Sequence, residues 1–376
     1  MASSLPSTMR AVVQTGPGKA TVESVPVPKA EHGFALVKVE ASLVHSNVAN
    51  IFKGEHKMFQ LPYPIIPGSF GVGRIAALGP DATTLHEGQF VMVSSFVRAR
   101  DDPSVNVIIG VTAGSTPAEQ HLYKTLSRNG LFAEYVLAPL ENIYRLDESR
   151  LFGSPQAGGL GYIPGELVVL SANAIVYGGM RSIALQPGER VIITPATGHY
   201  STAAVDVAVA LGARVVAASR SAAGLAKVKE TYPGAVETVQ LTGDVEADGK
   251  ALGAFGPVDA IVDVSPPAAT GATNLTAALS VLRQKGRLAL VGGRGDQTLP
   301  IPYFTAMVNS WTIKGSYMYG REELEGVVRL AETGLMKLGK RAGHVVQGVY
   351  GLDDFHAAMD KAVEKAGPGT LVYIKP

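Results

Sequence analysis

The chain of 376 residues contains no cysteine. Disulfides, thiolate nucleophiles, iron–sulfur clusters and thiolate-bound zinc are therefore excluded, because each of them needs a cysteine sulfur. Aromatic residues make up only 7% of the chain and charged residues 17%. No uninterrupted apolar stretch of about 18 residues occurs, so we expect no membrane span.

The two signs of charge are nearly balanced, because the chain has 33 basic and 32 acidic residues and a formal net charge of +1. The chain has no long basic run, so a nucleic-acid partner is not expected. The polar residues 1–8 are too short for a signal peptide, and Ile374-Lys375-Pro376 is not a peroxisomal address. We therefore expect a cytoplasmic protein that acts on a small-molecule substrate.

Apolar residues and turn residues are abundant. Hydrophobic residues amount to 46% of the chain, which also has 43 glycines and 23 prolines. The apolar content is ample for large buried cores, and the length predicts two domains. Many glycines and prolines in such a chain are typical of an α/β protein with tight turns.

The N-terminal part of the sequence predicts short strands. In residues 34–41, Ala35, Val37 and Val39 alternate with Lys38 and Glu40, the period-two pattern of a half-buried strand. Further strands are expected at residues 9–14, 71–78, 89–95, 130–138 and 142–145. Residues 61–68 are a proline-rich loop, and we interpret the poorly patterned residues 98–129 as an insertion or lobe.

Beyond residue 160, strands alternate with helices. The expected strands are residues 190–194, 214–218, 236–241, 260–264, 287–292 and 311–315. The expected helices are residues 166–183, 201–211, 222–232, 273–284 and 321–333. Such an alternation predicts parallel pairing in a doubly wound sheet, and the continuous apolar runs fit strands covered on both faces.

The turn after residues 190–194 joins a hydrophobic strand to a helix through small residues. A helix N-terminus offers backbone N–H groups and a partial positive charge that suit a pyrophosphate. Because only Gly198 of the usual glycine set is present, an ordinary βα turn is the alternative. We predict that a dinucleotide binds at Ala196, Thr197, Gly198, His199, Tyr200 and Ser201.

The next strand ends in Ser219-Arg220-Ser221. A site for NAD usually has Asp or Glu here, which binds the ribose 2′-hydroxyl. A guanidinium between two hydroxyls suits a 2′-phosphate instead, so this pattern predicts NADPH. A solvated surface arginine is the alternative interpretation of Arg220.

Two later strand ends are expected to face the cofactor, because ligands collect at the carboxyl ends of parallel strands. They carry Val264 and Ser265 in one case, and Gly292 and Gly293 in the other. The glycine pair equally fits a plain turn. Tyr317, which follows the last expected strand, is a further candidate near the cofactor's carboxamide.

The order of these parts resembles the medium-chain dehydrogenase/reductase superfamily over nearly the whole chain. The segments that carry the resemblance are residues 9–13, 26–28, 67–73, 130–136, 212–213 and 313–316. The resemblance implies a Rossmann doubly wound parallel sheet plus a β-rich, GroES-like substrate domain. The implied domains are residues 1–155 and 320–376 for the substrate and residues 156–319 for NADPH.

Zinc-dependent members of that superfamily differ from this chain at their metal ligands. They have a cysteine where this chain has Val44, and a His-Glu pair where it has Ser69-Phe70. They also often carry a four-cysteine lobe in the region of residues 98–129. Because a catalytic zinc needs three protein ligands, we expect no metal and place the chain in the zinc-independent branch. Quinone oxidoreductases and enoyl reductases belong to that branch.

Without zinc, hydride addition suits an activated C=C bond whose charge spreads onto a distant carbonyl oxygen. The resemblance places His45 and Ser46 near the reacting centre, and Tyr63 is a third candidate proton donor. His45 fits a structural or phosphate-binding role equally well, and Tyr63 fits packing. His56 is a lesser candidate. Met58, Phe59 and Phe70 suggest an apolar substrate pocket.

Three functions stay open at this point. The first is NADPH-dependent reduction of an α,β-unsaturated or quinone-like carbonyl. The second is zinc-free reduction of a ketone or aldehyde, and the third is a non-redox isomerase, cyclase or partner subunit that keeps the cofactor fold. The resemblance also implies a homodimer that pairs through residues 308–315.

Overall fold

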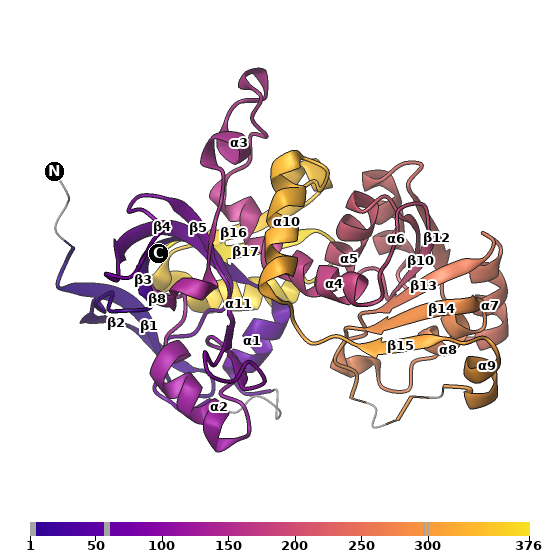
Figure 1. Cartoon of the computed structure of the whole chain (residues 1–376), viewed down its shortest axis with the longest axis horizontal. Coiled ribbons are helices and arrows are strands. Elements are labelled where there is room, and N and C mark those ends of the chain that lie inside the picture. Colours follow the sequence, from indigo (N-terminus) through magenta and orange to yellow (C-terminus); the bar gives the residue numbers. More distant parts are fainter. Residues whose placement is uncertain (1–4, 56–60, 296–297, 300) are drawn as a thin grey trace. The chain divides into compact units, whose positions relative to one another are not determined.

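The computed structural model describes residues 5–55, 61–295, 298–299 and 301–376. The chain forms two compact units (Figure 1). Unit 1 comprises Met1–Val169, Val345–Ala366 and Thr370–Pro376, and unit 2 comprises Leu170–His344 and Gly367–Gly369. The divisions between Val169 and Leu170 and between His344 and Val345 come later in the sequence than the divisions expected at residues 155/156 and 319/320.

The later end of unit 2 is explained by helix α10 (Arg321–Thr333). Its apolar face buries Leu324 and Val327 and packs against helix α4 (Leu170–Ser182). A Cβ atom at Gly326 would lie 2.6 Å from the ring of Tyr177 in α4, so the two helices approach closely at a glycine. The amphipathic pattern of α10 is visible in the sequence, but the surface that it covers is not.

Unit 1 is built on a seven-stranded sheet in the order β16-β17-β3-β4-β5-β9, with β8 also paired to β3. Its neighbouring strands run antiparallel, except that β16 and β17 are parallel. The strands of the sheet are β3 (Phe34–Val44), β4 (Gly71–Leu78), β5 (Phe90–Val93), β8 (Tyr135–Pro139), β9 (Ile143–Arg145), β16 (Val345–Tyr350) and β17 (Thr370–Ile374). The other elements of unit 1 are β1 (Thr8–Gly16), β2 (Lys19–Pro26), β6 (Phe96–Arg98), β7 (Asn106–Ile108), α1 (Ser46–Lys53), α2 (Pro117–Leu122), α3 (Glu148–Phe152) and α11 (Phe355–Glu364).

The region of residues 98–129 contributes to the core of unit 1. Strands β6 and β7 form an antiparallel pair, and α2 begins with a capping box between Thr116 and Glu119. Val107, Leu122 and Tyr123 are buried in the same cluster as residues of β3 and β5. The poor pattern of this region therefore reflects short, irregular elements whose apolar side chains complete the main core.

Unit 2 is built on a six-stranded sheet in the order β12-β11-β10-β13-β14-β15. All five pairings are parallel, which confirms the doubly wound sheet. The strands are β10 (Arg190–Thr194), β11 (Arg214–Ser219), β12 (Val236–Gln240), β13 (Val258–Asp263), β14 (Leu282–Leu290) and β15 (Thr312–Gly315). The other helices of unit 2 are α5 (His199–Ala210), α6 (Ala222–Thr231), α7 (Val245–Gly253), α8 (Asn274–Leu279) and α9 (Tyr303–Val308).

Several expected boundaries were wrong, among them the start of the helix expected at residues 166–183, which begins at Leu170, and of the strand expected at residues 287–292, which begins at Leu282. Helix α5 begins at His199 and not at Ser201, because Gly198 serves as its N-cap. The helix expected at residues 273–284 ends at Leu279, since β14 already begins at Leu282. The strand expected from residue 130 begins only at Tyr135, and before it Ala133 forms an isolated bridge with Ala11.

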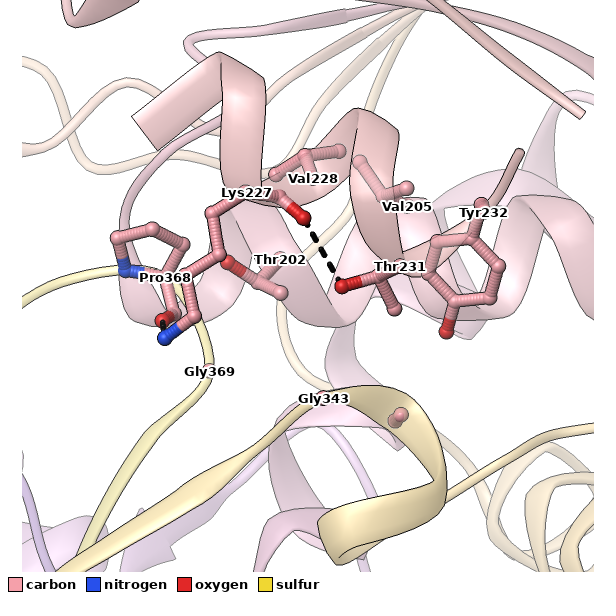
Figure 2. Close-up of a pocket in the computed structure, with 10 residues that line it drawn as sticks. Thr202, Val205, Lys227, Val228, Thr231, Tyr232, Gly343, Pro368 and Gly369 are labelled. Atoms are coloured by element: carbon pink, nitrogen blue, oxygen red, sulfur yellow. Dashed lines mark hydrogen bonds between the residues drawn. The ribbon is translucent and has the colours of Figure 1, made fainter. Parts of the chain in front are cut away.

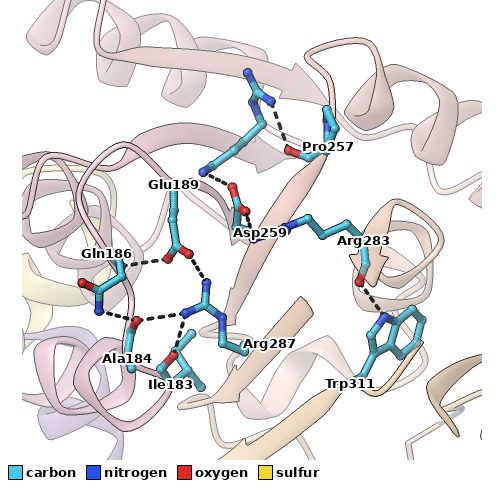
Figure 3. Close-up of polar contacts among 10 residues, drawn as sticks. Ile183, Ala184, Gln186, Glu189, Pro257, Asp259, Arg283, Arg287 and Trp311 are labelled. Carbon is cyan, nitrogen blue, oxygen red and sulfur yellow. Dashed lines mark hydrogen bonds and ion pairs between the residues drawn. The ribbon is translucent and has the colours of Figure 1, made fainter. Parts of the chain in front are cut away.

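Polar contacts join the amino-terminal halves of the central strands in unit 2 (Figure 3). The backbone N–H of Arg190 in β10 donates to Asp259 of β13 at 2.7 Å, and Arg283 of β14 pairs with the same carboxylate at 2.6 Å. Arg287 of β14 pairs with Glu189 at 2.6 Å. These contacts hold the strands together near their amino-terminal ends. The carboxyl ends of the strands are the place where a ligand of such a sheet binds.

Candidate functional site

The turn between β10 and α5 has the geometry of an anion-binding helix start. Gly198 is the N-cap in an extended conformation, and no side chain caps the helix. The first helical bond runs from the N–H of Thr202 to the carbonyl of Gly198 at 2.9 Å. The backbone N–H groups of the first turn come before Thr202 and therefore have no acceptor within the helix. Such N–H groups, together with the helix dipole, favour an anion.

The side chains around this turn are held by the neighbouring strand β11. Ala196 is fully buried and its N–H donates to the carbonyl of Ala218 at 2.9 Å, so that amide is engaged in the fold. The hydroxyls of Thr197 and Ser219 lie 2.7 Å apart. The side chain of Ser201 is buried on the first turn of α5. The structure thus brings the predicted phosphate turn and the end of β11 together.

The two aromatic residues of the turn, His199 and Tyr200, pack edge to face with their ring centroids 5.3 Å apart. Burial lowers the pKa of His199 to about 4, and the charge of His344 acts in the same direction. Burial also raises the pKa of Tyr200. His199 is therefore neutral near pH 7, and attraction for a phosphate at this turn has to come from backbone amides and the helix dipole.

The segment after β11 presents the polar side chains that the sequence predicted. Arg220 and Ser221 are exposed, and no carboxylate among the described residues pairs with the guanidinium of Arg220. The Ser221 hydroxyl accepts from the N–H of Gly224 at 3.1 Å and so caps α6. Sequence reasoning missed Gly224, where a Cβ atom would lie 2.8 Å from the Thr197 side chain. No local motif marks this glycine, because its partner is 27 residues away in the sequence.

The ends of β10 and β13 meet where the strand order of the sheet reverses. Thr194 and Asp263 are paired there, and ligands of doubly wound sheets bind at such a reversal. The Ser265 hydroxyl donates to Asp263 at 2.5 Å, and Asn274 donates both to Ser265 and to Thr194. Burial raises the pKa of Asp263, whereas the Ser265 hydroxyl and Arg294 oppose that change. The sequence did not reveal the link to Asn274.

The predicted residues at the later strand ends differ in exposure. Val264 is buried and its N–H donates to the carbonyl of Thr194 at 3.0 Å. A Cβ atom at Gly292 would lie 2.4 Å from the backbone of Ser265, so these two turns are in contact and a glycine is required. Gly293 faces open space. Tyr317 is 63% exposed, although the next residue, Met318, is buried with a positive φ of 58°.

In unit 1, His45 and Ser46 lie where β3 passes into α1. His45 is the N-cap residue of α1 and is buried, with its ring stacked on Phe70 at a centroid distance of 6.1 Å. Ser46 is the first residue of the helix and is partly exposed. The structure thus brings His45 and Ser46 together at one helix start, and places the Phe70 ring beside them.

Tyr63 belongs to a different part of unit 1. It packs against the core cluster that contains Tyr123, whereas Val44 and Val48 beside His45 belong to another cluster. Burial raises the pKa of Tyr63. These contacts fit the packing alternative for Tyr63. His56, Met58 and Phe59 lie outside the described residues.

A second group of polar side chains lies within unit 2, around Asp206 of α5. Buried Asp206 of α5 accepts a hydrogen bond from the Tyr232 hydroxyl at 2.7 Å, and Nε2 of His344 lies 3.2 Å from its other oxygen. Tyr232 borders a small hollow where Lys227 donates to the carbonyl of Pro368 at 2.9 Å (Figure 2). These polar groups are engaged with one another, so the arrangement anchors residues 343–344 and 367–369 on the helices of unit 2.

Comparison with known proteins gives the family. The family model for the alcohol dehydrogenase GroES-like domain matches residues 31–148, and that for zinc-binding dehydrogenase matches residues 201–333. An alcohol dehydrogenase of Rhizobium meliloti (strain 1021) is 32% identical over 342 residues, which cover 87% of this chain and 89% of that protein. The chain belongs to the medium-chain dehydrogenase/reductase superfamily.

Other members of the superfamily are similar over comparable lengths. A quinone oxidoreductase of Sus scrofa is 26% identical over 314 residues, covering 83% of this chain and 80% of that protein. A structure from Sinorhizobium meliloti 1021 described as a zinc-binding dehydrogenase bound to NADP has a TM-score of 0.75 at 20% identity, covering 99% of this chain and 100% of that chain. The curated relatives are oxidoreductases, so this superfamily member is an oxidoreductase.

The fit of a zinc ion can be judged from the side chains present. At the positions where the sequence resemblance implies zinc ligands, the chain has Val44, Ser69 and Phe70, which are all buried. An isopropyl group, a hydroxyl and a phenyl ring do not provide the nitrogen, sulfur or carboxylate ligands that zinc requires. Within the described part of the chain, no three His, Asp or Glu side chains are grouped to hold a metal. The donor set therefore does not fit zinc.

One further property concerns membranes. No helix in the described part of the chain combines the length and the apolar character that crossing a bilayer requires.

Proposed function

We propose that this protein is a zinc-independent, NADPH-dependent reductase of small apolar substrates that carry an activated C=C bond. Such substrates are α,β-unsaturated carbonyl or quinone-like compounds. The observation that carries the proposal is the end of β11, where Ser219, Arg220 and Ser221 stand and no carboxylate follows. When bound, the dinucleotide supplies a hydride.

The chain's own groups have separate tasks in this proposal. The first-turn amides of α5 bind the pyrophosphate, and Arg220 with Ser221 binds the 2′-phosphate. The turns at Val264–Ser265 and Gly292–Gly293 orient the ring that carries the hydride. On unit 1, His45 and Ser46 provide the polar groups that hold the substrate oxygen or deliver a proton.

The preference for a C=C bond rests on the chemistry of the three side chains at the expected zinc-ligand positions. A carbonyl carbon accepts hydride readily only when its oxygen is strongly polarised, and Val44, Ser69 and Phe70 cannot hold a zinc ion for that task. With an enone or a quinone, negative charge spreads through the conjugated system, and ordinary hydrogen-bond donors suffice to stabilise it.

The test of the proposed function follows NADPH oxidation by absorbance against enones, quinones, ketones and aldehydes, each with and without a metal chelator. We expect turnover of enones or quinones that the chelator leaves unchanged. Turnover confined to ketones and aldehydes would favour the zinc-free carbonyl reductase. Tight binding of NADPH without oxidation by any compound would favour the non-redox alternatives.

Replacing Arg220 by alanine is expected to raise the KM for NADPH about tenfold to a hundredfold, and to change that for NADH less than about twofold. A charge-assisted hydrogen bond contributes about 1.5–3 kcal/mol, and only NADPH carries the phosphate that accepts it. Arg214→Ala is the matched control, because Arg214 is an exposed arginine at the opposite end of the same strand. Equal changes for the two cofactors would contradict the assignment.

We also propose that a second copy of the chain covers the edge of the six-stranded sheet. Strand β15 is the last strand of the sheet, and α9 just before it exposes large apolar side chains. Tyr303 is 83% exposed and Phe304 is 71% exposed. Such a surface is typical of a protein interface.

The double variant Tyr303→Ser, Phe304→Glu is expected to convert a dimer into a monomer with its thermal unfolding midpoint little changed. Loss of apolar anchors of this kind raises an interface Kd by about 30-fold or more. Light scattering after size exclusion measures the mass. Val349→Glu, at an exposed valine of β16, is the control that should stay dimeric. A wild-type protein that is monomeric at tens of micromolar contradicts the proposal.

A further inference from the structure

Asn274 at the start of α8 connects the ends of β10 and β13, and it lies 80 residues beyond Thr194 in the sequence. Its Nδ2 group donates to the Thr194 hydroxyl at 3.1 Å and to the Ser265 hydroxyl at 3.2 Å. Ser265 in turn donates to the carboxyl group of Asp263 at 2.5 Å. All four side chains are buried. Buried polar groups in such a chain hold one another in a single arrangement.

The position of this chain in the sheet gives it a specific role. Thr194 ends β10, and the phosphate-binding turn begins at the next residue. Ser265 belongs to the turn after β13, whose backbone touches Gly292 at the end of the following strand. β10 and β13 are neighbours at the point where the strand order reverses. The two hydrogen bonds of Asn274 therefore add a side-chain link, beside the backbone pairing of β10 and β13, between the pyrophosphate turn and the turn after β13.

Binding of the adenine half of the cofactor does not involve the hydrogen bonds of Asn274. Arg220 and Ser221 follow β11, and their turn is tied to the phosphate turn through Ser219 and Thr197. A dinucleotide extends to the turns after β13 and β14, whereas adenosine 2′,5′-bisphosphate has no nicotinamide and needs only the end of β11 and the first-turn amides of α5. Only the dinucleotide therefore reports on the turns after β13 and β14.

We infer that Asn274 is a positioning residue for the nicotinamide half of the cofactor, acting through Thr194 and Ser265. The inference rests on the proposed function. Asn274 does not touch the reacting atoms in this role. It helps to hold the Val264–Ser265 turn in a fixed position relative to the start of α5. The pyrophosphate and the nicotinamide can then bind to these two places simultaneously.

The test compares two ligands by titration calorimetry, NADPH and adenosine 2′,5′-bisphosphate. For Asn274→Ala we expect the Kd of NADPH to rise about tenfold and that of the bisphosphate to change less than about twofold, as for the loss of one or two neutral hydrogen bonds on the nicotinamide side. Thr276→Ala, on the same helix but outside the network, should leave both constants unchanged. Equal weakening of both ligands, or no weakening of either, would overturn the inference.

A second pair of variants tests the hydrogen bond between Asn274 and Thr194 without leaving a cavity in the core. Thr194→Val keeps the shape of the side chain and removes its hydroxyl, and Thr194→Ser keeps the hydroxyl. We expect the valine variant to weaken NADPH binding severalfold and the serine variant to retain it. The combination Thr194→Val with Asn274→Ala should weaken binding by less than the product of the single effects, because one bond is lost in both.

Failure of the inference and failure of the proposed function give different results. If the wild-type protein binds neither ligand, the proposed function is wrong and the inference falls with it. If the wild-type protein binds both and the Thr194 and Asn274 variants bind them equally well, only the inference is wrong. Should Asn274→Ala not fold, Thr194→Val decides the question alone.

Discussion

Replacing Asp206 by leucine is expected to lower the free energy of unfolding by about 3–5 kcal/mol. Asp206 is buried, and its two oxygens face the Tyr232 hydroxyl and Nε2 of His344. Leucine fills much of the same space but accepts no hydrogen bond. Two buried donors are then left without their acceptor, and each costs about 1–3 kcal/mol.

Denaturant unfolding followed by tryptophan fluorescence measures this change. The chain has a single tryptophan, Trp311, which lies in unit 2 together with Asp206. The signal therefore reports on the unit that carries the substitution. Tyr232→Phe removes one donor only and should cost about 1 kcal/mol.

Glu230→Leu is the matched control, since Glu230 is an exposed carboxylate of α6 in the same unit. A surface change of that kind is expected to stay within about 0.5 kcal/mol. An Asp206→Leu variant that loses less than about 1 kcal/mol would show that Tyr232 and His344 find other acceptors, and the anchoring role would have to be abandoned.

Loss of the proton donor is expected to lower kcat about 10²–10⁴-fold. His45 and Ser46 stand together at the start of α1, so we expect the loss in His45→Ala or Ser46→Ala. Tyr63→Phe should keep most of its turnover, because Tyr63 packs against a different part of the core of unit 1. The measurement is kcat with saturating NADPH and the substrate identified by the panel.

Asn50→Ala provides a control on the same helix, one turn beyond Ser46. A variant that merely loosens α1 should resemble this control and show a lower thermal midpoint. If all three candidate variants retain most of their turnover, the proton comes from water or from the substrate, and unit 1 contributes position alone.

Much of unit 2 follows from local patterns. The expected strand at residues 190–194 and helix at residues 321–333 have the observed bounds, because a buried apolar run and a 3.6-residue periodicity are both local signals. The start of α5 was two residues off. His199 and Tyr200 do not look like a first helical turn, and only the extended Gly198 shows that the helix already begins there.

The parts of the site that were missed depend on contacts between distant segments. Asn274 meets Thr194 across 80 residues of sequence, and Gly224 is required by Thr197. Neither residue has a neighbour in the sequence that hints at its role. Similarly, the apolar face of α10 predicts that the helix is covered, but the covering helix α4 is known only once the chain is folded.

The short segment Gly367–Gly369 has a consequence for anyone who wishes to transplant the dinucleotide-binding half of this molecule. It belongs to unit 2, although a helix and a strand of unit 1 separate it from His344. A continuous fragment cut at His344 would lack Pro368, the carbonyl that receives the Lys227 ammonium. Chimaeras that exchange this half therefore need two pieces of chain, and the smaller piece is only a tripeptide.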